Sequence, residues 1–296
     1  TLAVLPRKVI EQYGDRWLHA RPLPVSGAFQ LGAWRVNEKV RLVRNPRYWD
    51  AANTASEIID VLPVGSANIA LNLYETGAAD IVWDEDLEPV ELMDVLKSRP
   101  DCHTFPYFGT YYYRFNVTKP PFNDPRVRRA FALATDKELL VRKLTGGGGE
   151  KPASHYVPDG VANYEPPEGL PHDVEAARRL LAEAGFPGGK NFPRFNYTFF
   201  GGSGGAQLQS QIGVELQQMW RDALGVELEL RQVERKIFYS AQSKLDYDLS
   251  ASSWVGDYND ANTFLDMFLS ASGNNRTGWK NARYDELLRD ANMQID

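Results

Sequence analysis

The sequence is poor in the residues that build disulfides and metal sites. Its 296 residues include one cysteine, Cys102, and four histidines. A single cysteine cannot form an internal disulfide, and it is compatible with either a reducing or an oxidising compartment. The histidines stand at positions 19, 103, 155 and 172, without the short spacing typical of metal ligands. We therefore expect no metal site and no cofactor.

Basic charge in excess and long hydrophobic runs are also missing. The 33 Lys and Arg residues are outnumbered by 39 Asp and Glu residues, which gives a formal net charge of −6. Because nucleic-acid binding relies on a basic surface, nucleic acid is not an expected partner. No stretch approaches the roughly 20 apolar residues of a membrane-spanning helix. The segment from Thr1 to Pro6 has neither the basic start nor the apolar core of a signal peptide, so none is expected within the numbered sequence.

Strand-like and helix-like segments alternate along the chain, which predicts an α/β protein with mixed sheets. Apolar and polar residues alternate over 27–37 and 39–45, which predicts a hairpin, and β-branched residues predict a buried strand over 57–64. Further strands are predicted over 79–83, 195–200, 225–233 and 247–254. The 43% hydrophobic content suits one large or two medium domains, and the best boundary lies near residues 105–110.

Several predicted helices carry clear start and stop residues. Asp124 followed by Pro125 is typical of an N-cap and a first helical position. Asp173 caps a second predicted helix, which Gly185 ends, and Ser66 caps a short one. Other helices are predicted over 88–99, 208–220 and 284–294.

Arginines follow the predicted start of the helix at Asp124. Arg126, Arg128 and Arg129 fall in its first turns, where the helix dipole disfavours cations. We therefore expect these arginines to have an acidic partner.

Motifs of the common enzyme classes are not found. The glycine runs 146–149 and 201–205 lack the Lys-Ser/Thr that follows in a phosphate-binding P-loop, so both are predicted to be connecting loops. The pairs Ser26-Gly27 and Ser203-Gly204 lack the pattern of a nucleophile elbow. The sequence therefore does not predict an enzyme.

The segment 254–260, Trp-Val-Gly-Asp-Tyr-Asn-Asp, is unusual in how it leaves a predicted strand. It passes through an aromatic residue and a glycine to two acids within a few positions. A plain turn would account for this pattern. A carboxylate held at the end of a sheet, where α/β proteins bind ligands, would account for it as well.

Taken in order, several long segments resemble the extracytoplasmic solute-binding proteins of ABC importers, in the peptide- and nickel-binding group, and most of all the oligopeptide-binding proteins. The segments that carry the resemblance are 26–50, 107–144, 177–187 and 254–288. The resemblance implies an incomplete set of periplasmic-binding-protein type II-like lobes, α/β with mixed β-sheets flanked by helices. Residues 1–107 would form part of lobe I and residues 108–296 most of lobe III, so the chain resembles an internal portion of longer family members.

The resemblance also implies a binding site at the segment 254–260. In the oligopeptide binders, the strand that ends at this tryptophan lends its backbone to an extended peptide. Ser253, Trp254 and Val255 would supply main-chain hydrogen bonds, and Asp257 would bind the α-amino group of the peptide. Gly256 would let a ligand backbone approach closely. Side-chain pockets or the ligand path are implied for Trp83, Tyr107 and Asn274. For Trp83 and Tyr107, a place in the hydrophobic core is the open alternative.

Two departures from the family pattern bear on the ligand. Relatives can have a disulfide between the positions of Gly109 and Val255. They also place arginines, which meet a peptide carboxylate, at the positions of Gln242 and Ala251. Both features are missing from this sequence, so the resemblance leaves the preferred ligand length open.

As a whole, the resemblance implies the ligand-binding component of an ABC transporter, a monomer that is not an enzyme. It would bind oligopeptides by hinge closure in the periplasm and deliver them to a membrane permease. A nickel chelate, an opine or an oligosaccharide is an alternative ligand. A peptide hydrolase is the alternative from another class.

Overall fold

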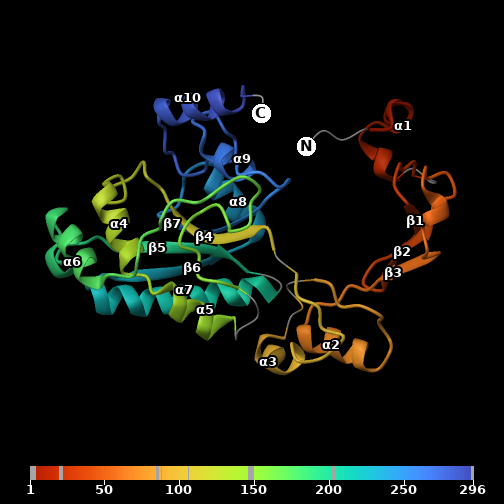
Figure 1. Ribbon diagram of the computed structural model, residues 1–296, viewed down its shortest axis with the longest axis horizontal. Coiled ribbons are helices and arrows are strands. Elements are labelled where there is room, and N and C mark those ends of the chain that lie inside the picture. Colours follow the sequence, from red (N-terminus) through yellow and green to blue (C-terminus); the bar gives the residue numbers. More distant parts are fainter. Residues whose placement is uncertain are drawn as a thin grey trace. The chain divides into compact units, whose positions relative to one another are not determined.

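The computed structural model describes residues 5–19, 23–84, 87, 89–105, 107–145, 150–201 and 204–294. The chain divides into two compact units, Thr1–Gly65 and Ser66–Asp296 (Figure 1). The glycine loop predicted over 146–149, and residues 202–203 of the other one, lie outside the described residues. The lobe boundary between residues 107 and 108 stays a prediction.

The first unit is built on a three-stranded antiparallel sheet in the order β1-β2-β3. Its elements are α1 (Arg7–Tyr13), η1 (Gly14–His19), β1 (Phe29–Arg35), β2 (Lys39–Arg44), η2 (Ala51–Asn53) and β3 (Ile58–Val61). Strands β1 and β2 confirm the predicted hairpin. Their register shifts at Gly32, where a Cβ atom would lie 2.9 Å from Cγ1 of Val43. The close approach of Val43 therefore explains the glycine.

Strand β3 forms where the sequence predicts a strand, but the prediction that it is buried is wrong. Ile58 and Val61 are 53% and 51% exposed. Polar contacts hold this strand instead, because Asp60 accepts hydrogen bonds from Arg41 and Lys39 on β2. These hydrogen bonds, Arg41 foremost, hold the pKa of Asp60 well below its ordinary value.

Residues 66–105 contain less regular structure than the sequence predicts. Helix α2 (Ala67–Glu75) begins after Ser66 as predicted, although the Ser66 side chain forms no capping hydrogen bond. The helix predicted over 88–99 is reduced to η4 (Val90–Leu92) and α3 (Met93–Leu96). The strand predicted over 79–83 is wrong: among the described residues it pairs with no other strand. Without a partner, apolar and β-branched residues are not enough to form one.

A four-stranded mixed sheet forms the centre of the second unit, in the order β4-β7-β5-β6. The strands are β4 (Gly109–Phe115), β5 (Phe195–Phe200), β6 (Leu228–Val233) and β7 (Leu249–Val255). Strand β5 runs parallel to β6 and β7, whereas β4 runs antiparallel to β7. Strands β5, β6 and β7 confirm the predictions for these segments.

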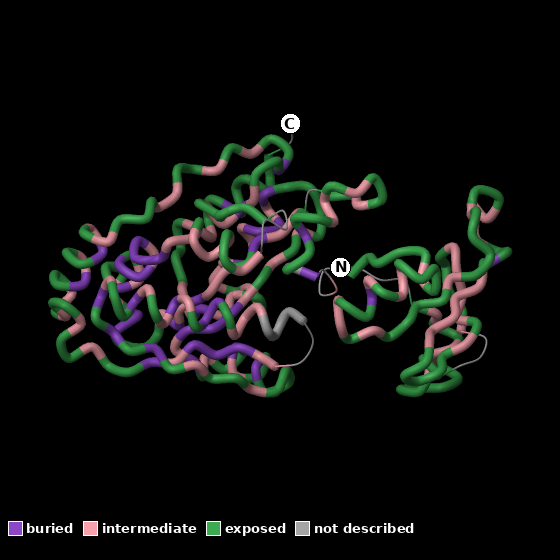
Figure 2. The backbone as a smooth tube through the Cα atoms, turned by 90° about the horizontal axis from the view of Figure 1, so that it is seen from below, coloured by how far each residue is buried: buried purple, intermediate pink, exposed green. Residues whose placement is uncertain are grey.

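Helices and an aromatic core cover one side of this sheet. The elements are α4 (Pro125–Leu133), α5 (Lys137–Leu144), α6 (Val174–Glu183), η5 (Pro187–Gly189) and α7 (Gly204–Leu224). Trp220 of α7 is fully buried, with its ring centroid 5.6 Å from that of Tyr113 on β4 and 4.7 Å from that of Phe131 on α4. Buried residues are concentrated in this part of the chain (Figure 2).

The predicted helix starts are confirmed in this core. The Asp124 side chain accepts a hydrogen bond from the backbone N–H of Arg126, and Asp173 caps α6 in the same way. Gly185, at φ +99°, follows α6. The expected acidic partner exists for Arg126, which pairs with Asp124 at 2.6 Å. Arg128 instead donates to the carbonyl oxygens of residues 122 and 123.

The other side of the sheet is covered by residues 150–165 and by α8 (Arg235–Ser243), α9 (Asn262–Leu265), η6 (Asp266–Phe268) and α10 (Ala282–Ala291). Figure 1 shows α7 on one side of the sheet and α9 and α10 on the other. Thr110 of β4 donates to the carbonyl of Tyr156 at 2.9 Å, and the rings of Tyr112 and Tyr156 meet edge to face. Phe264 is fully buried in a second small core. Helix α9 and its neighbours are thereby fixed close to the end of β7.

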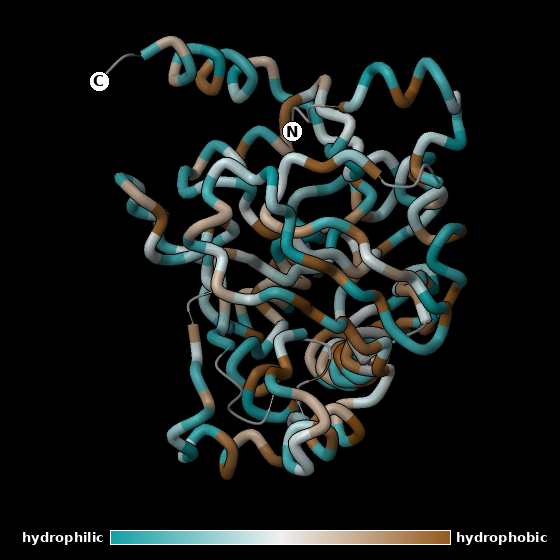
Figure 3. The backbone as a smooth tube through the Cα atoms, turned by 90° about the vertical axis from the view of Figure 1, so that its right-hand side faces the viewer, coloured by the Kyte–Doolittle hydropathy of each residue, from teal (hydrophilic) through white to brown (hydrophobic). Residues whose placement is uncertain are grey.

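Hydrophobic and hydrophilic stretches alternate along the backbone (Figure 3). Among the helices of the described residues, none combines the length and the apolar character that crossing a membrane requires.

Candidate functional site

Strand β7 loses its neighbour on one side before it ends. Its pairing with β5 covers only Leu249 and Ser250, whereas its pairing with β4 continues to Val255. Exposure rises along the same direction, from buried at Ala251 to exposed at Ser253 and Val255. Residues 251–255 therefore form an open edge at the carboxyl end of the parallel strands, where ligands bind in many α/β sheets.

The antiparallel ladder with β4 decides which backbone groups face this open edge. Asn116 donates to the carbonyl of Asp248, and Gly256 donates to the carbonyl of Phe108. Hydrogen-bonded pairs alternate along an antiparallel ladder, so Ser250, Ser252 and Trp254 also turn their backbone groups towards β4.

The backbone N–H and C=O groups of Ser253 and Val255 then point to the open side. Of the three residues predicted to offer main-chain hydrogen bonds, these two have the required orientation. Trp254 has its backbone groups directed to β4, so its contribution at this strand end is its side chain.

Thr263 at the start of α9 fixes the chain beyond the open edge. Its carbonyl accepts a hydrogen bond from the indole Nε1 of Trp254 at 2.6 Å, and its Oγ1 accepts one from the backbone N–H of Asp257 at 3.0 Å. Thr263 itself is only 2% exposed. The backbone of Asp257 is thus held by a buried side chain, while the Asp257 carboxylate is exposed.

Packing within the protein explains why residue 256 is a glycine. A Cβ atom at this position would collide with the ring of Phe108, whose carbonyl accepts the Gly256 N–H at 2.8 Å. The Phe108 ring in turn packs edge to face on Phe264, with centroids 5.1 Å apart. The close approach predicted for a ligand is therefore made by Phe108 of the protein itself.

A second carboxylate lies close to Asp257. Burial raises the pKa of Asp266, and the negative charge of Asp257 raises it further. Two carboxylates that influence each other in this way favour the approach of a cation. Neither Thr263 nor Asp266 is identified as a site residue by sequence, because both belong to the next helical segment and reach Asp257 only through the fold.

The other predicted site residues differ in how they relate to the open edge. Tyr107 lies beside it, since a Cβ atom on Gly109 would come within 2.8 Å of Cε1 of Tyr107, and Gly109 is the register partner of Val255. Trp83 is 84% exposed in the segment after α2, and Asn274 is exposed in a turn. Within the described residues, no hydrogen bond or ring contact joins Trp83 or Asn274 to the end of β7.

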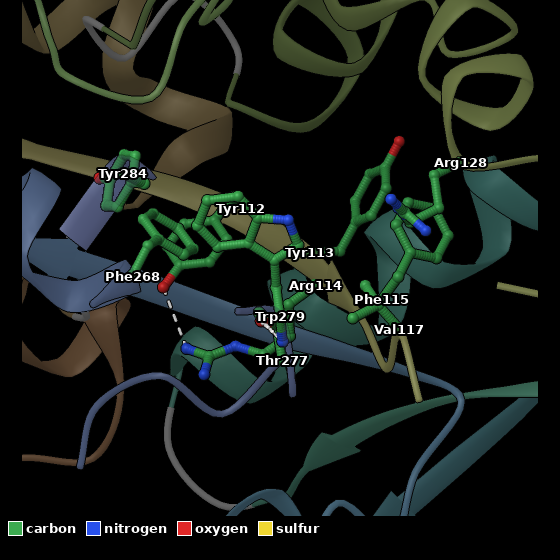
Figure 4. A pocket seen from close by; sticks show the side chains of 10 residues that line it. All are labelled: Tyr112, Tyr113, Arg114, Phe115, Val117, Arg128, Phe268, Thr277, Trp279 and Tyr284. Atoms are coloured by element: carbon green, nitrogen blue, oxygen red, sulfur yellow. Dashed lines mark hydrogen bonds between the residues drawn. The ribbon is translucent and has the colours of Figure 1, made fainter. Parts of the chain in front are cut away.

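A hollow of about 430 Å³ lies along the free edge of β4, lined partly by Arg114 (Figure 4). The Arg114 side chain, 8% exposed, donates to the hydroxyls of Tyr112 and Ser252, while its Nε and Nη1 atoms have no hydrogen-bond partner. Figure 4 shows the hydrogen bond from this guanidinium to the Tyr112 hydroxyl, which is 3.0 Å long. None of the residues predicted to bind ligand lines the hollow. Within the described part of the chain, no group of three or more His, Cys, Asp or Glu side chains could hold a metal ion.

Comparisons with known proteins agree on one family. The model of the family described as bacterial extracellular solute-binding proteins, family 5 Middle, matches residues 1–276. The periplasmic oligopeptide-binding protein OppA of Salmonella typhimurium is 34% identical, over 98% of this chain and 53% of its own length. The probable deoxycholate-binding periplasmic protein YgiS of Escherichia coli is 33% identical, over 100% of this chain and 55% of its own length.

Solved structures give the same result. The murein tripeptide-binding protein MppA of Escherichia coli superimposes with a TM-score of 0.83 at 31% identity, over 99% of this chain and 57% of MppA. The chain spans about half the length of the curated relatives that it matches. The α/β fold with helix-flanked mixed sheets is thus shared with periplasmic binding proteins, as predicted.

Proposed function

Because the chain belongs to the bacterial extracellular solute-binding proteins of family 5, we propose that it forms part of a protein that binds short peptides for an ABC importer. Its relatives are binding proteins and not enzymes, and they include the oligopeptide-binding protein OppA and the murein peptide-binding protein MppA. The protein would work outside the cytoplasm as a monomer, close over its ligand, and deliver it to a membrane permease.

The observation that carries this proposal is an open strand edge that ends at a carboxylate. An extended peptide can pair with the backbone groups of Ser253 and Val255, because strand addition uses main-chain groups that every peptide has. The α-amino group of the peptide would then lie near Asp257, which fixes the register of the pairing. Asp266 adds a second negative charge behind Asp257. Backbone pairing and amine binding together suit many side chains.

A ligand without an amine is the alternative. The relative YgiS, named as a probable deoxycholate-binding protein, matches the whole chain at 33% identity. A steroid acid would use neither the main-chain groups of the open edge nor the carboxylate of Asp257. Binding of a peptide would therefore depend on Asp257, whereas binding of a steroid acid would not.

Calorimetry with the full-length native protein tests the proposal. We expect a free tetrapeptide to bind at least tenfold more tightly than its N-acetylated form, because acetylation removes the ammonium group. The variant Asp257→Asn should lose at least about tenfold in affinity for the free peptide, or roughly 1.4 kcal/mol, and should lose little for the acetylated one.

Asp260→Asn is the matched control, since Asp260 is an exposed acid of the same loop. Its Oδ1 accepts a hydrogen bond from the backbone N–H of Asn262 at 2.7 Å. This control should bind both peptides as the native protein does. Equal affinity of the native protein for free and acetylated peptides would refute the role of Asp257. Binding of deoxycholate but of no peptide would favour the alternative ligand class.

A further inference from the structure

The open edge of β7 has a second end, which is defined by Gln242 of α8. Nε2 of Gln242 donates to the carbonyl of Ala251 at 3.1 Å and to Oγ of Ser250 at 2.7 Å. Gln242 is only 3% exposed, so this amide is a fixed part of the structure. Backbone groups open to a ligand therefore begin after Ala251.

An arginine continues from this glutamine. Nη1 of Arg276 donates to Oε1 of Gln242 at 3.1 Å, and Nε of Arg276 is buried without a hydrogen-bond partner. The Arg276 guanidinium lies 5.7 Å from the ring centroid of Tyr239, within the range of a cation–π contact. Arg276 is thus held close to the end of the open edge by a hydrogen bond to Gln242 and a cation–π contact with Tyr239.

A second arginine lies against the same ring. The Arg235 guanidinium is 5.9 Å from the Tyr239 centroid and 5.5 Å from that of Phe200, the last residue of β5. Among the described residues, neither Arg235 nor Arg276 forms an ion pair with a carboxylate. Glu234, the acid next in sequence, accepts a hydrogen bond from the backbone N–H of residue 237. Two cations share one ring here without an acid between them, and an anion bound at this place would balance their charge.

We infer that Arg276, assisted by Arg235, binds the free carboxylate of the peptide whose amino group lies at Asp257. This inference rests on the proposed function of the β7 edge. Gln242 and Ala251 stand where the family resemblance places the arginines that meet a peptide carboxylate. In this chain Arg276 brings a cation to the same end of the edge from the loop before α10, and Gln242 links it to the strand.

The separation of the two ends predicts the length of the ligand. From Val255 to Ala251 the strand advances by four residues, which is about 13 Å at ~3.3 Å per residue. An extended peptide of about four residues has the same length. A tetrapeptide with both termini free would therefore place its ammonium at Asp257 and its carboxylate at Arg276 and Arg235.

Calorimetry with tetra-alanine and its C-terminal amide, on the full-length native protein, tests this inference. We expect the amide to bind at least tenfold more weakly, because it lacks the carboxylate. Arg276→Met should weaken binding of the free acid at least tenfold and leave binding of the amide unchanged, so that most of the preference for the free acid is lost. Arg276→Lys should restore part of the preference, and Arg235→Met should reduce it less than Arg276→Met does.

Arg283→Met is the control, because Arg283 is an exposed arginine of α10 that pairs with Glu286 at 2.6 Å. It should keep the full preference for the free acid. If Arg276→Met does not fold, the comparison of acid and amide in the native protein and in Arg235→Met still decides the matter. Tri- and penta-alanine should bind more weakly than tetra-alanine, and equal affinities would overturn the predicted length.

The two proposals fail in different ways. If the native protein binds the acid and the amide equally, while N-acetylation still weakens binding, the role of Arg276 is overturned and the peptide function stands. If the native protein binds none of these peptides, the proposed function itself is wrong.

Discussion

Asp257 and Asp266 lie at the same strand end but in different surroundings. Asp257 is exposed, and its backbone N–H is held by the hydroxyl of Thr263. Asp266 lies in η6, where burial raises the pKa of its carboxyl and Asp257 raises it further. The exposed carboxylate is free to meet a ligand, whereas the partly buried one increases the negative charge behind it.

The raised pKa of Asp266 gives a stability prediction with a definite sign. A carboxyl whose folded pKa lies above the unfolded value of ~3.9 destabilises the folded state wherever it is ionised. The penalty is complete above the folded pKa, shrinks as the pH falls through it, and vanishes below the unfolded pKa. We expect Asp266→Asn to raise the free energy of unfolding at pH 7 by up to about 1 kcal/mol, since the site is only partly buried. Urea unfolding at several pH values measures this.

The gain from Asp266→Asn should largely disappear near pH 3.5, where the Asp266 carboxyl is mostly protonated in both the folded and the unfolded state. Asp257→Asn serves as the comparison, because it removes the smaller of the two causes and should give a smaller gain with the same pH trend. A gain that is constant from pH 7 to pH 3.5 would show that ionisation of Asp266 is not its origin.

Sequence predicts residues whose local chemistry is distinctive, and misses those that act through the fold. The order Trp254, Gly256, Asp257 marks the strand end, because an aromatic residue, a glycine and an acid stand within four positions directly after the strand pattern. The reason for Gly256 is the Phe108 ring, more than a hundred positions earlier in the chain. Thr263 and Arg276 have no local pattern, so only the folded chain identifies them.

At the scale of elements, the open edge comes from unequal strand pairing. Strand β5 pairs with β6 along its whole length but with β7 at two positions only. The local residue pattern predicts β5, β6 and β7 as strands, although both faces of the sheet are covered and β5 is buried along most of its length. Register depends on partners that are distant in sequence, so the open edge itself could not be predicted.

The antiparallel ladder between β4 and β7 predicts a disulfide that this chain can accept. Gly109 and Val255 are register partners, and the alternation of the ladder makes them a non-hydrogen-bonded pair, with Cα atoms about 4.5 Å apart. This spacing is within the disulfide range. In a Cys102→Ser background, we expect Gly109→Cys with Val255→Cys to oxidise and to raise the free energy of unfolding by roughly 2–4 kcal/mol.

Counting free thiols and comparing urea unfolding with and without reductant tests this expectation. A Cβ atom at residue 109 would meet the ring of Tyr107, so that ring must move slightly. Each single cysteine variant is the control, since it carries the same side-chain change without the bond. If the double variant keeps two free thiols under oxidising conditions, Gly109 and Val255 are not register partners at the end of β7.

At the scale of the whole molecule, the hydrophobic core belongs to one of the two units. All members of the main core cluster lie between Phe122 and Ala251, around the sheet of the second unit. In the described residues of the first unit, Asn45 is the one buried residue. Composition does not predict this difference, because apolar residues such as Ile58 and Trp34 occur in the first unit too but remain exposed.

The distribution of the core predicts how the two units behave apart. We expect residues 66–296 to unfold cooperatively in urea, with a slope of roughly 2–3 kcal/mol per M, because they contain a closed aromatic core around Trp220. Residues 1–65 alone should show no cooperative transition, since a small sheet without buried apolar side chains is at best marginally stable in water. Near-ultraviolet circular dichroism and fluorescence during urea titration follow both polypeptides. A sharp transition in residues 1–65 would mean that ion pairs such as Arg41 with Asp60 and the backbone ladder stabilise the sheet without a core.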